Sequence, residues 1–319
     1  MVPRTNRIVW FFAFGYFVCY AFYSALVKQL TGGAADVPAL TLLPAVTFGT
    51  ALTLPLLVAT LGWWRVAPRF DRDTLVAGAA TGVIILTTTL AYTFDGVSIV
   101  FTLLLLRGGV LILAPVVDTL MGREVRWFCW AALAASMGGI AVALLNSRDR
   151  SMTVVAALNT LAYLAAYAVR LPRMTKCAKG AEPLATRRWF LGEMTIALAV
   201  QLLLPLAIAL TPAGAQLRGG IVSIEPAGLL VGVLYGCLYF FGTSVYLDRR
   251  ENTFCVPLNR GASVLAGIAA TIAIGGTLHA ADVAGASLVV GALLFLSPVH
   301  HLPESFFARV FARKKELVP

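Results

Sequence analysis

Residues 101–121 read FTLLLLRGGVLILAPVVDTLM, an apolar run interrupted by one arginine, Arg107. Residues 254–274 read FCVPLNRGASVLAGIAATIAI and place Arg260 at the same point of a second run. About 20 apolar residues cross the hydrocarbon core of a bilayer. An arginine inside that core costs roughly 2.5 to 3.5 kcal/mol on insertion scales. Two such helices that each keep an arginine indicate that the chain uses both.

The two runs belong to a longer internal match. A shift of 153 positions aligns residues 95–138 with residues 248–291 without a gap, with eight identities in 44 positions. Such self-similarity indicates a duplication. A unit of five spans reverses its orientation when it is repeated, so we expect two inverted halves, residues 1–147 and 148–304. The identities include residue types that are rare or position-specific in membrane helices: Asp95 with Asp248, Arg107 with Arg260, Gly108 with Gly261, Gly122 with Gly275, and Gly138 with Gly291.

The composition is that of a membrane protein. Of 319 residues, 59% are hydrophobic and only 13% are charged, whereas about a quarter of a soluble domain is charged. Dividing the chain at charged and turn-forming clusters predicts an all-α integral membrane protein with ten transmembrane helices in two inverted five-helix repeats. The predicted spans are residues 8–30, 38–62, 74–93, 98–121, 126–146, 151–171, 188–211, 225–247, 253–275 and 280–299.

The basic residues sort by side of the membrane. Nineteen of the 25 Lys and Arg residues fall in segments on one side, three fall on the other, and Lys28, Arg107 and Arg260 fall within spans. The positive-inside rule then predicts that both termini are cytoplasmic, and we expect the bacterial inner (plasma) membrane. The net charge of +10 therefore reflects orientation, and no nucleic-acid partner is expected. The tail, residues 305–319, is predicted to lie on anionic membrane lipid.

The two arginines predict a substrate site. Arg107 lies about nine residues into its span, roughly 13 Å below one surface, and Arg260 lies a similar distance from the opposite surface. The pair therefore brackets the bilayer midplane, where inverted-repeat transporters bind substrate. A guanidinium fork suits carboxylate or phosphate oxygens, so we expect a small organic anion as partner. The polar residues expected to line the same cavity are Asn259, Tyr92, Asn159, Tyr163, Tyr167 and Tyr239.

Two carboxylates fall near the inner ends of predicted spans, Asp118 and Glu193. An intramembrane carboxylate is a natural proton carrier, so both are candidates for proton coupling. The alternative is that they neutralise the arginines in structural ion pairs. Asp118 is eleven residues from Arg107, roughly 16 Å along one helix, and does not pair with that arginine directly.

Enzyme motifs are missing from the sequence. There is no His-Glu-x-x-His, no Gly-x-Ser-x-Gly and no P-loop, and the five cysteines have no metal-ligand spacing. We therefore expect no enzyme activity, no cofactor and no metal. Without a nucleotide site, transport would be driven by gradients of substrate, proton or another ion.

The stretch Leu106-Arg107-Gly108-Gly109, ending in Gly122-Arg123-Glu124, resembles the helix-4 signature of the drug/metabolite transporter (DMT) superfamily in its ten-helix, EamA-like form. The resemblance implies two five-helix halves, short loops and cytoplasmic termini over nearly the whole chain. In members that move sugar phosphates and nucleotide sugars, basic residues of the fourth and ninth helices hold the phosphate. Arg107 and Arg260 match them in kind and in helix.

These observations predict a secondary active membrane transporter, a permease or antiporter, that moves an anionic or phosphorylated organic solute by alternating access. Three alternatives remain open: an EamA-like exporter of amino acids or drug-like metabolites with structural arginines, a flippase of a lipid-linked phosphate, and a non-transporting membrane scaffold. Glycines spaced four apart, Gly78 with Gly82 and Gly228 with Gly232 and Gly236, predict close helix packing. The same glycine faces would also serve a homodimer.

Overall fold

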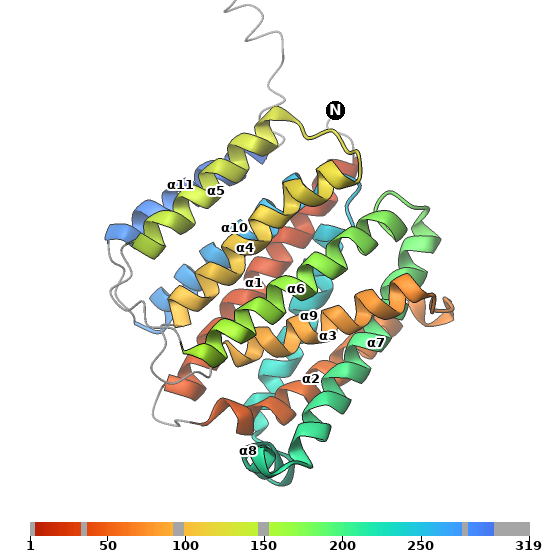
Figure 1. The fold of residues 1–319 in the computed structure, drawn as a ribbon, viewed down its shortest axis with the longest axis vertical. Helices are drawn as coiled ribbons and strands as arrows, with labels where there is room; N and C mark the ends of the chain where they lie inside the picture. Colours follow the sequence, from red (N-terminus) through yellow and green to blue (C-terminus); the bar gives the residue numbers. More distant parts are fainter. Residues whose placement is uncertain (1–3, 33–36, 92–98, 146–152, 276–279, 297–319) are drawn as a thin grey trace, which may run out of the picture.

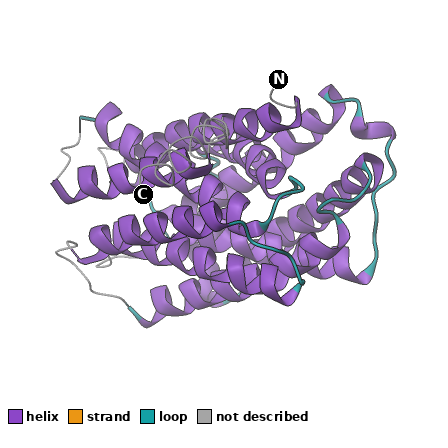
Figure 2. Ribbon diagram, turned by 90° about the horizontal axis from the view of Figure 1, so that it is seen from above, coloured by secondary structure: helices purple, strands orange, loops and turns teal. Residues whose placement is uncertain are grey.

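The computed structural model describes residues 4–32, 37–91, 99–145, 153–275 and 280–296, and within them the chain is helical, with no strand (Figures 1 and 2). Seven of these helices, α1, α2, α3, α6, α7, α9 and α10, are long and apolar enough to cross a membrane. The chain is an all-α integral membrane protein. The helices are α1 (Arg4–Gly32), α2 (Ala39–Thr60), η1 (Trp63–Arg65), α3 (Arg72–Leu90), α4 (Ile99–Leu120), α5 (Trp127–Leu145), α6 (Val154–Cys177), α7 (Pro183–Ala209), η2 (Pro212–Gly214), α8 (Ala215–Val222), α9 (Pro226–Tyr246), α10 (Asn252–Ala273) and α11 (Ala280–Leu296).

The helix boundaries differ most from the predicted spans at the turn between α6 and α7, and the short α-helix α8 was not predicted. Helix α6 continues to Cys177, and α7 begins at Pro183, whereas the apolar runs suggested an end at 171 and a start at 188. Apolar patterning marks only the part of a helix in the hydrocarbon, and the polar turns beyond it keep their backbone hydrogen bonds. The short α8 follows α7 and has too few residues to cross a bilayer.

Helices from the first half of the chain pack against helices from the second half. Helix α1 packs on α9 and α10, while α6 packs on α3 and α4. In the same way α2 packs on α9, and α7 packs on α3. Figure 1 shows α5 and α11 side by side along one edge of the bundle, with α2, α7 and α8 toward the opposite edge. The centre of the molecule is therefore built by α1, α3, α4, α6, α9 and α10 together.

Glycines allow the closest of these contacts. A Cβ atom at Gly232 would lie 2.3 Å from the carbonyl oxygen of Val46 and 2.8 Å from Cα of Gly49 across the α2–α9 contact. A Cβ at Gly78 would lie 2.9 Å from the carbonyl oxygen of Glu193 across the α3–α7 contact. No other residue fits at these distances, so the predicted packing role of these glycines is confirmed.

Glycine also ends both arginine-bearing helices. Gly122 after α4 has φ 63°, and Gly275 after α10 has φ 74°. Only glycine adopts this left-handed conformation without steric cost, and it commonly terminates a helix. This requirement explains why the internal match retains glycine at both positions.

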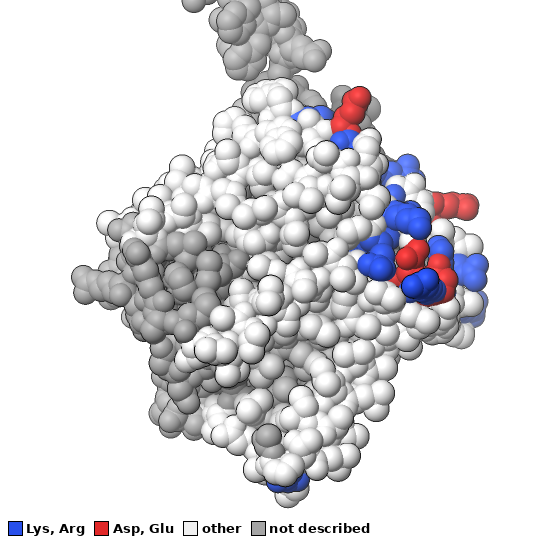
Figure 3. Space-filling view, viewed as in Figure 1, with Lys and Arg blue, Asp and Glu red and all other residues white. Residues whose placement is uncertain are grey.

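The surface separates into charged and apolar zones. Figure 3 shows charged side chains gathered along one end of the bundle, and the broad flank between the ends carries none. The charged zone includes Asp73 with its partners Arg173 and Lys176, where α6 ends and α3 begins. Large apolar side chains are exposed on the flank, among them Phe14 at 65% and Leu203 at 63% exposure. Such a flank suits contact with lipid.

Candidate functional site

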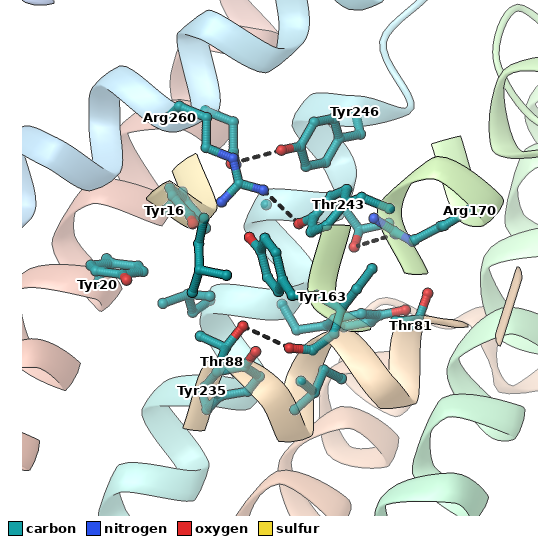
Figure 4. A pocket seen from close by; sticks show the side chains of 18 of the residues that line it. Tyr16, Tyr20, Thr81, Thr88, Tyr163, Arg170, Tyr235, Thr243, Tyr246 and Arg260 are labelled. Carbon is teal, nitrogen blue, oxygen red and sulfur yellow. Dashed lines mark hydrogen bonds between the residues drawn. The ribbon is translucent and has the colours of Figure 1, made fainter. Parts of the chain in front are cut away.

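A cavity of about 70 Å³ lies where the six central helices meet, room for a few water molecules. Its wall is rich in tyrosine and carries three arginines, Arg107, Arg170 and Arg260. Figure 4 labels the last two of these arginines and five of the tyrosines. Seven of the nine tyrosines in the chain are collected here, so the cavity combines aromatic walls with many hydroxyl groups. These tyrosines are Tyr16, Tyr20, Tyr163, Tyr167, Tyr235, Tyr239 and Tyr246.

Helical spacing brings these side chains to one place. On α6, Tyr163, Tyr167 and Arg170 follow each other by four and three residues, which keeps them on one face of the helix. All three line the cavity. On α1, Tyr16 and Tyr20 have the same spacing and line the cavity from the other side.

Arg260 is a buried cation without a carboxylate partner among the residues that the structure describes. Its side chain is 6% exposed. Nη2 donates a hydrogen bond of 2.6 Å to the Tyr167 hydroxyl, and the guanidinium carbon lies 5.0 Å from the centre of that ring. Within the described part of the chain, Arg260 forms no ion pair and its Nε has no hydrogen-bond partner. Beside it, Nδ2 of the buried Asn259 also has no partner among described residues.

Arg107 makes the corresponding contact on α1. Its side chain is 9% exposed, Nη2 donates a hydrogen bond of 3.2 Å to the Tyr20 hydroxyl, and the guanidinium carbon lies 5.5 Å from that ring. Arg107 on α4 therefore contacts the second tyrosine of α1, and Arg260 on α10 contacts the second tyrosine of α6. The two arginines occupy matching environments.

A buried ion pair forms a third feature of the wall. Nε of Arg170 lies 2.6 Å from Oε1 of Glu193, and Nη2 lies 3.3 Å from Oε2. The Thr81 hydroxyl donates a 2.7 Å hydrogen bond to Oε1, and Arg170 Nη2 donates a 3.3 Å bond to the Thr243 hydroxyl. The Arg170 side chain is 4% exposed and that of Glu193 is fully buried. Glu193 thus neutralises Arg170 and leaves Arg260 without this partner.

Arg170 was missed by the sequence reasoning. Because it lies next to the end of an apolar run, it is one of the nineteen basic residues assigned to one side of the membrane and was not expected in the site; it is 3% exposed and lines the cavity. The signal that would have found it is its spacing from Tyr163 and Tyr167. The same four-residue spacing would also have identified Tyr16 and Tyr20.

The other predicted residues fall into three groups. Tyr163, Tyr167, Tyr239 and Asn259 line the cavity with the two predicted arginines. Asn159 lies outside the cavity wall, and its Nδ2 donates a 3.0 Å hydrogen bond to the Thr87 carbonyl oxygen. Tyr92 lies outside the described residues.

Asp118 on α4 does not line the cavity. Its side chain contacts the first turn of α10. Its fully buried carboxylate accepts hydrogen bonds from Asn252 N at 2.9 Å, Asn252 Nδ2 at 2.8 Å, Thr253 N at 2.7 Å and Thr253 Oγ1 at 2.7 Å. A carboxylate is favourable at a helix N-terminus, where backbone N–H groups have no partner within the helix. Glu251 is the N-cap residue of α10, but its side chain does not cap the helix. Its carboxylate instead accepts a hydrogen bond from Arg126. The proton-coupling role of Asp118 stays a prediction.

The described residues contain no group of three or more His, Cys, Asp or Glu side chains placed to hold a metal ion. No protein-family model and no curated protein matches the sequence. Twenty-five chains of solved structures have a similar fold. One of them, described only as "Crystal structure of protein", matches with a TM-score of 0.59 at 16% identity, over 92% of this chain and 98% of that chain. This similarity shows the fold alone.

Proposed function

We propose that the protein is a secondary active membrane transporter that carries an anionic organic solute, including phosphorylated ones, through the central cavity. The observation that carries this proposal is Arg260. Taking a charge out of water costs several kcal/mol unless a partner compensates it, and a guanidinium stays protonated. A carboxylate or phosphate in the cavity would supply the missing charge and accept a hydrogen bond from the unpartnered Nε.

The architecture supports a duplicated carrier. Helices α1 and α6 exchange partners in a matched way, since α1 packs on α9 and α10 while α6 packs on α3 and α4. The contacts of Arg107 with Tyr20 and of Arg260 with Tyr167 follow the same exchange. We therefore infer ten spans in two inverted halves, residues 1–147 and 148–304, as in a DMT-superfamily, EamA-like permease. The charged end of the bundle in Figure 3 supports cytoplasmic termini, and a bacterial inner membrane stays part of the proposal.

The size of the cavity supports alternating access. At about 70 Å³ it has room for little more than water, so an organic solute needs the helices around it to separate. At the contacts of α2 with α9 and of α3 with α7, glycines leave no protruding side chain to block a sliding movement of one helix along the other. A site that is open to each side in turn is the arrangement that a gradient-driven carrier requires.

The test is a thermal-shift screen of the purified protein with four probes: glucose 6-phosphate, UDP-glucose, benzoate and tryptophan. The variant is Arg260→Gln. Its matched control is Arg218→Gln on α8, an arginine that binds the carbonyl oxygens of Ala209 and Thr211 far from the cavity. A ligand that binds the folded state raises the unfolding temperature by mass action.

We expect one of the anionic probes to stabilise the wild type and Arg218→Gln but not Arg260→Gln. Stabilisation by zwitterionic tryptophan alone, equal in all three proteins, would contradict the anion site and favour the amino-acid exporter. An absence of stabilisation by every anionic probe would contradict the proposal as well.

A further inference from the structure

The Arg170–Glu193 pair is the only buried ion pair in the described cavity wall, and it joins four helices. Arg170 comes from α6 and Glu193 from α7, while the hydroxyl groups that bind them come from Thr81 on α3 and Thr243 on α9. Arg170 faces the cavity directly, and Glu193 lies behind it. The pair is thus placed to sense both a ligand in the cavity and the packing of the surrounding helices.

The position on α1 that matches Arg170 in spacing carries no charge. Tyr16, Tyr20 and Tyr23 on α1 have the same spacing as Tyr163, Tyr167 and Arg170 on α6, so Tyr23 stands where α6 has arginine. Tyr23 is fully buried and packs against Tyr20 and Tyr235, with ring centres 5.9 and 5.4 Å apart. Apolar replacement of a buried ion pair is often neutral or stabilising. A pair kept in one half alone therefore points to a role in function.

Arg170 and Arg260 face the same space. Arg260 binds the hydroxyl of Tyr167, one helical turn before Arg170. The guanidinium carbon of Arg170 lies 5.9 Å from the ring of Tyr246, whose hydroxyl donates to Asn259, the residue before Arg260. Figure 4 shows Arg170 and Arg260 among the residues that line one cavity. An anion held by Arg260 would therefore also attract Arg170.

We propose that Glu193 is the proton carrier of this transporter and that Arg170 exchanges Glu193 for the substrate anion. This inference rests on the proposed function. When the anion binds Arg260 and Arg170, two negative groups compete for one guanidinium in a medium of low dielectric constant, where like charges repel strongly. Glu193 relieves the repulsion by taking up one proton. When the anion leaves, Glu193 releases that proton and pairs with Arg170 again, so one proton crosses with each anion.

Among the described residues around Glu193, Arg170 is the cation that can exchange Glu193 for the substrate anion. Helix α6 presents the charged group of Arg170 to Glu193. Helix α9 presents the phenol of Tyr239, which is titratable but uncharged. Helix α3 contributes the hydroxyl of Thr81, and its Asp73 is engaged with Arg173 and Lys176 at the surface. Helix α2 contains no charged residue, and the cation of α8, Arg218, binds backbone at the far end of α7. A protonated Glu193 keeps Thr81 as a hydrogen-bond partner.

The experiment uses proteoliposomes that enclose a pH-sensitive dye, with inward gradients of labelled glucose 6-phosphate, UDP-glucose or benzoate. Anion entry and lumen pH are recorded together. The variants are Glu193→Gln, the double variant Arg170→Gln/Glu193→Gln, and the control Glu182→Gln, a carboxylate at the surface end of α7. The double variant removes both charges, so no unpaired arginine is left to destabilise the fold.

We expect the wild type and Glu182→Gln to take up an anion and to acidify the lumen. The ratio of protons to labelled anions taken up should fall to zero in Glu193→Gln and in the double variant, whatever their rate of anion entry. Acidification that persists in Glu193→Gln or in the double variant would overturn the inference, as would anion uptake without acidification in the wild type, and both results leave the transporter intact. A wild type that moves none of the three anions would overturn the proposed function and this inference with it.

Discussion

Asp118→Ala should destabilise the protein strongly, because Asp118 holds the first turn of the helix that carries Arg260. The carboxylate accepts four hydrogen bonds of 2.7 to 2.9 Å from Asn252 and Thr253 and is fully buried. Each hydrogen bond to a charged group is worth about 1.5 to 3 kcal/mol, but four that share one carboxylate do not add. Loss of a buried charged partner typically costs about 3 to 5 kcal/mol, and we expect a cost in that range.

The assay is thermal unfolding of the detergent-purified protein. At roughly 2 to 4 °C per kcal/mol, as in chains of 150 to 250 residues, this cost lowers the midpoint by about 6 to 20 °C. The control is Asp73→Ala, which removes a half-exposed carboxylate 3.7 Å from Arg173 and 3.5 Å from Lys176. A surface pair of this kind contributes about 0 to 1 kcal/mol. Equal midpoints for the two variants would refute the reasoning.

Two further changes test the electrostatics at the start of α10 and the packing of α9 against α2. Burial by itself would raise the pKa of Glu251, but its hydrogen bonds from Arg126 and Cys129 outweigh burial and lower the pKa below the ordinary value of 4.5. A lowered pKa in the folded state adds stability above the unfolded-state value and loses it as the pH falls. Glu251→Gln should therefore unfold at a lower temperature than the wild type at pH 7, and the gap should close as the pH falls below 4.5; a gap that is constant with pH would contradict this. Gly232→Ala should destabilise by about 1 to 3 kcal/mol through overpacking, since its Cβ would meet backbone of α2 at 2.3 Å. Gly267→Ala on α10 meets no atom within 4 Å and should be neutral or stabilising, so equal thermal midpoints for the two alanine variants would count against the close contact.

The features that could be predicted from sequence are those with a direct energetic cost. A run of about 20 apolar residues is unstable in water as an exposed helix, so its length marks a membrane span. An arginine within such a run is equally conspicuous, which is why Arg107 and Arg260 were found and why both face the cavity. Tyr163, Tyr167 and Tyr239 were found for a related reason, since a polar group at mid-span needs a polar surrounding.

The features that could not be predicted depend on lateral contacts between helices. The depth of Asp118 follows from its position in α4, but its partners lie in the first turn of α10, 134 residues later in the chain. The apolar pattern does not show how deep Arg170 lies in the membrane, because the apolar run ends beside it while α6 continues for seven more residues. Its partner Glu193 comes from another helix. A hydropathy profile indicates how deep a residue lies in the membrane, but it does not indicate which helix the residue faces.

The tyrosine spacing explains why the proposed duplication is visible in only part of the sequence. Tyr16 and Tyr163 lie 147 positions apart, whereas Arg107 and Arg260 lie 153 apart, so the second half must contain six more residues between these helices. The structure has η2 and α8 in that interval, where the first half has the three-residue η1. A comparison that allows a gap at this connection aligns both arginines and both pairs of tyrosines. In that alignment Tyr23 corresponds to Arg170, so the Arg170–Glu193 pair is a charged departure from symmetry inside the cavity. Such a departure is what we expect of a carrier whose two halves share the binding of substrate while one half alone binds the coupling proton.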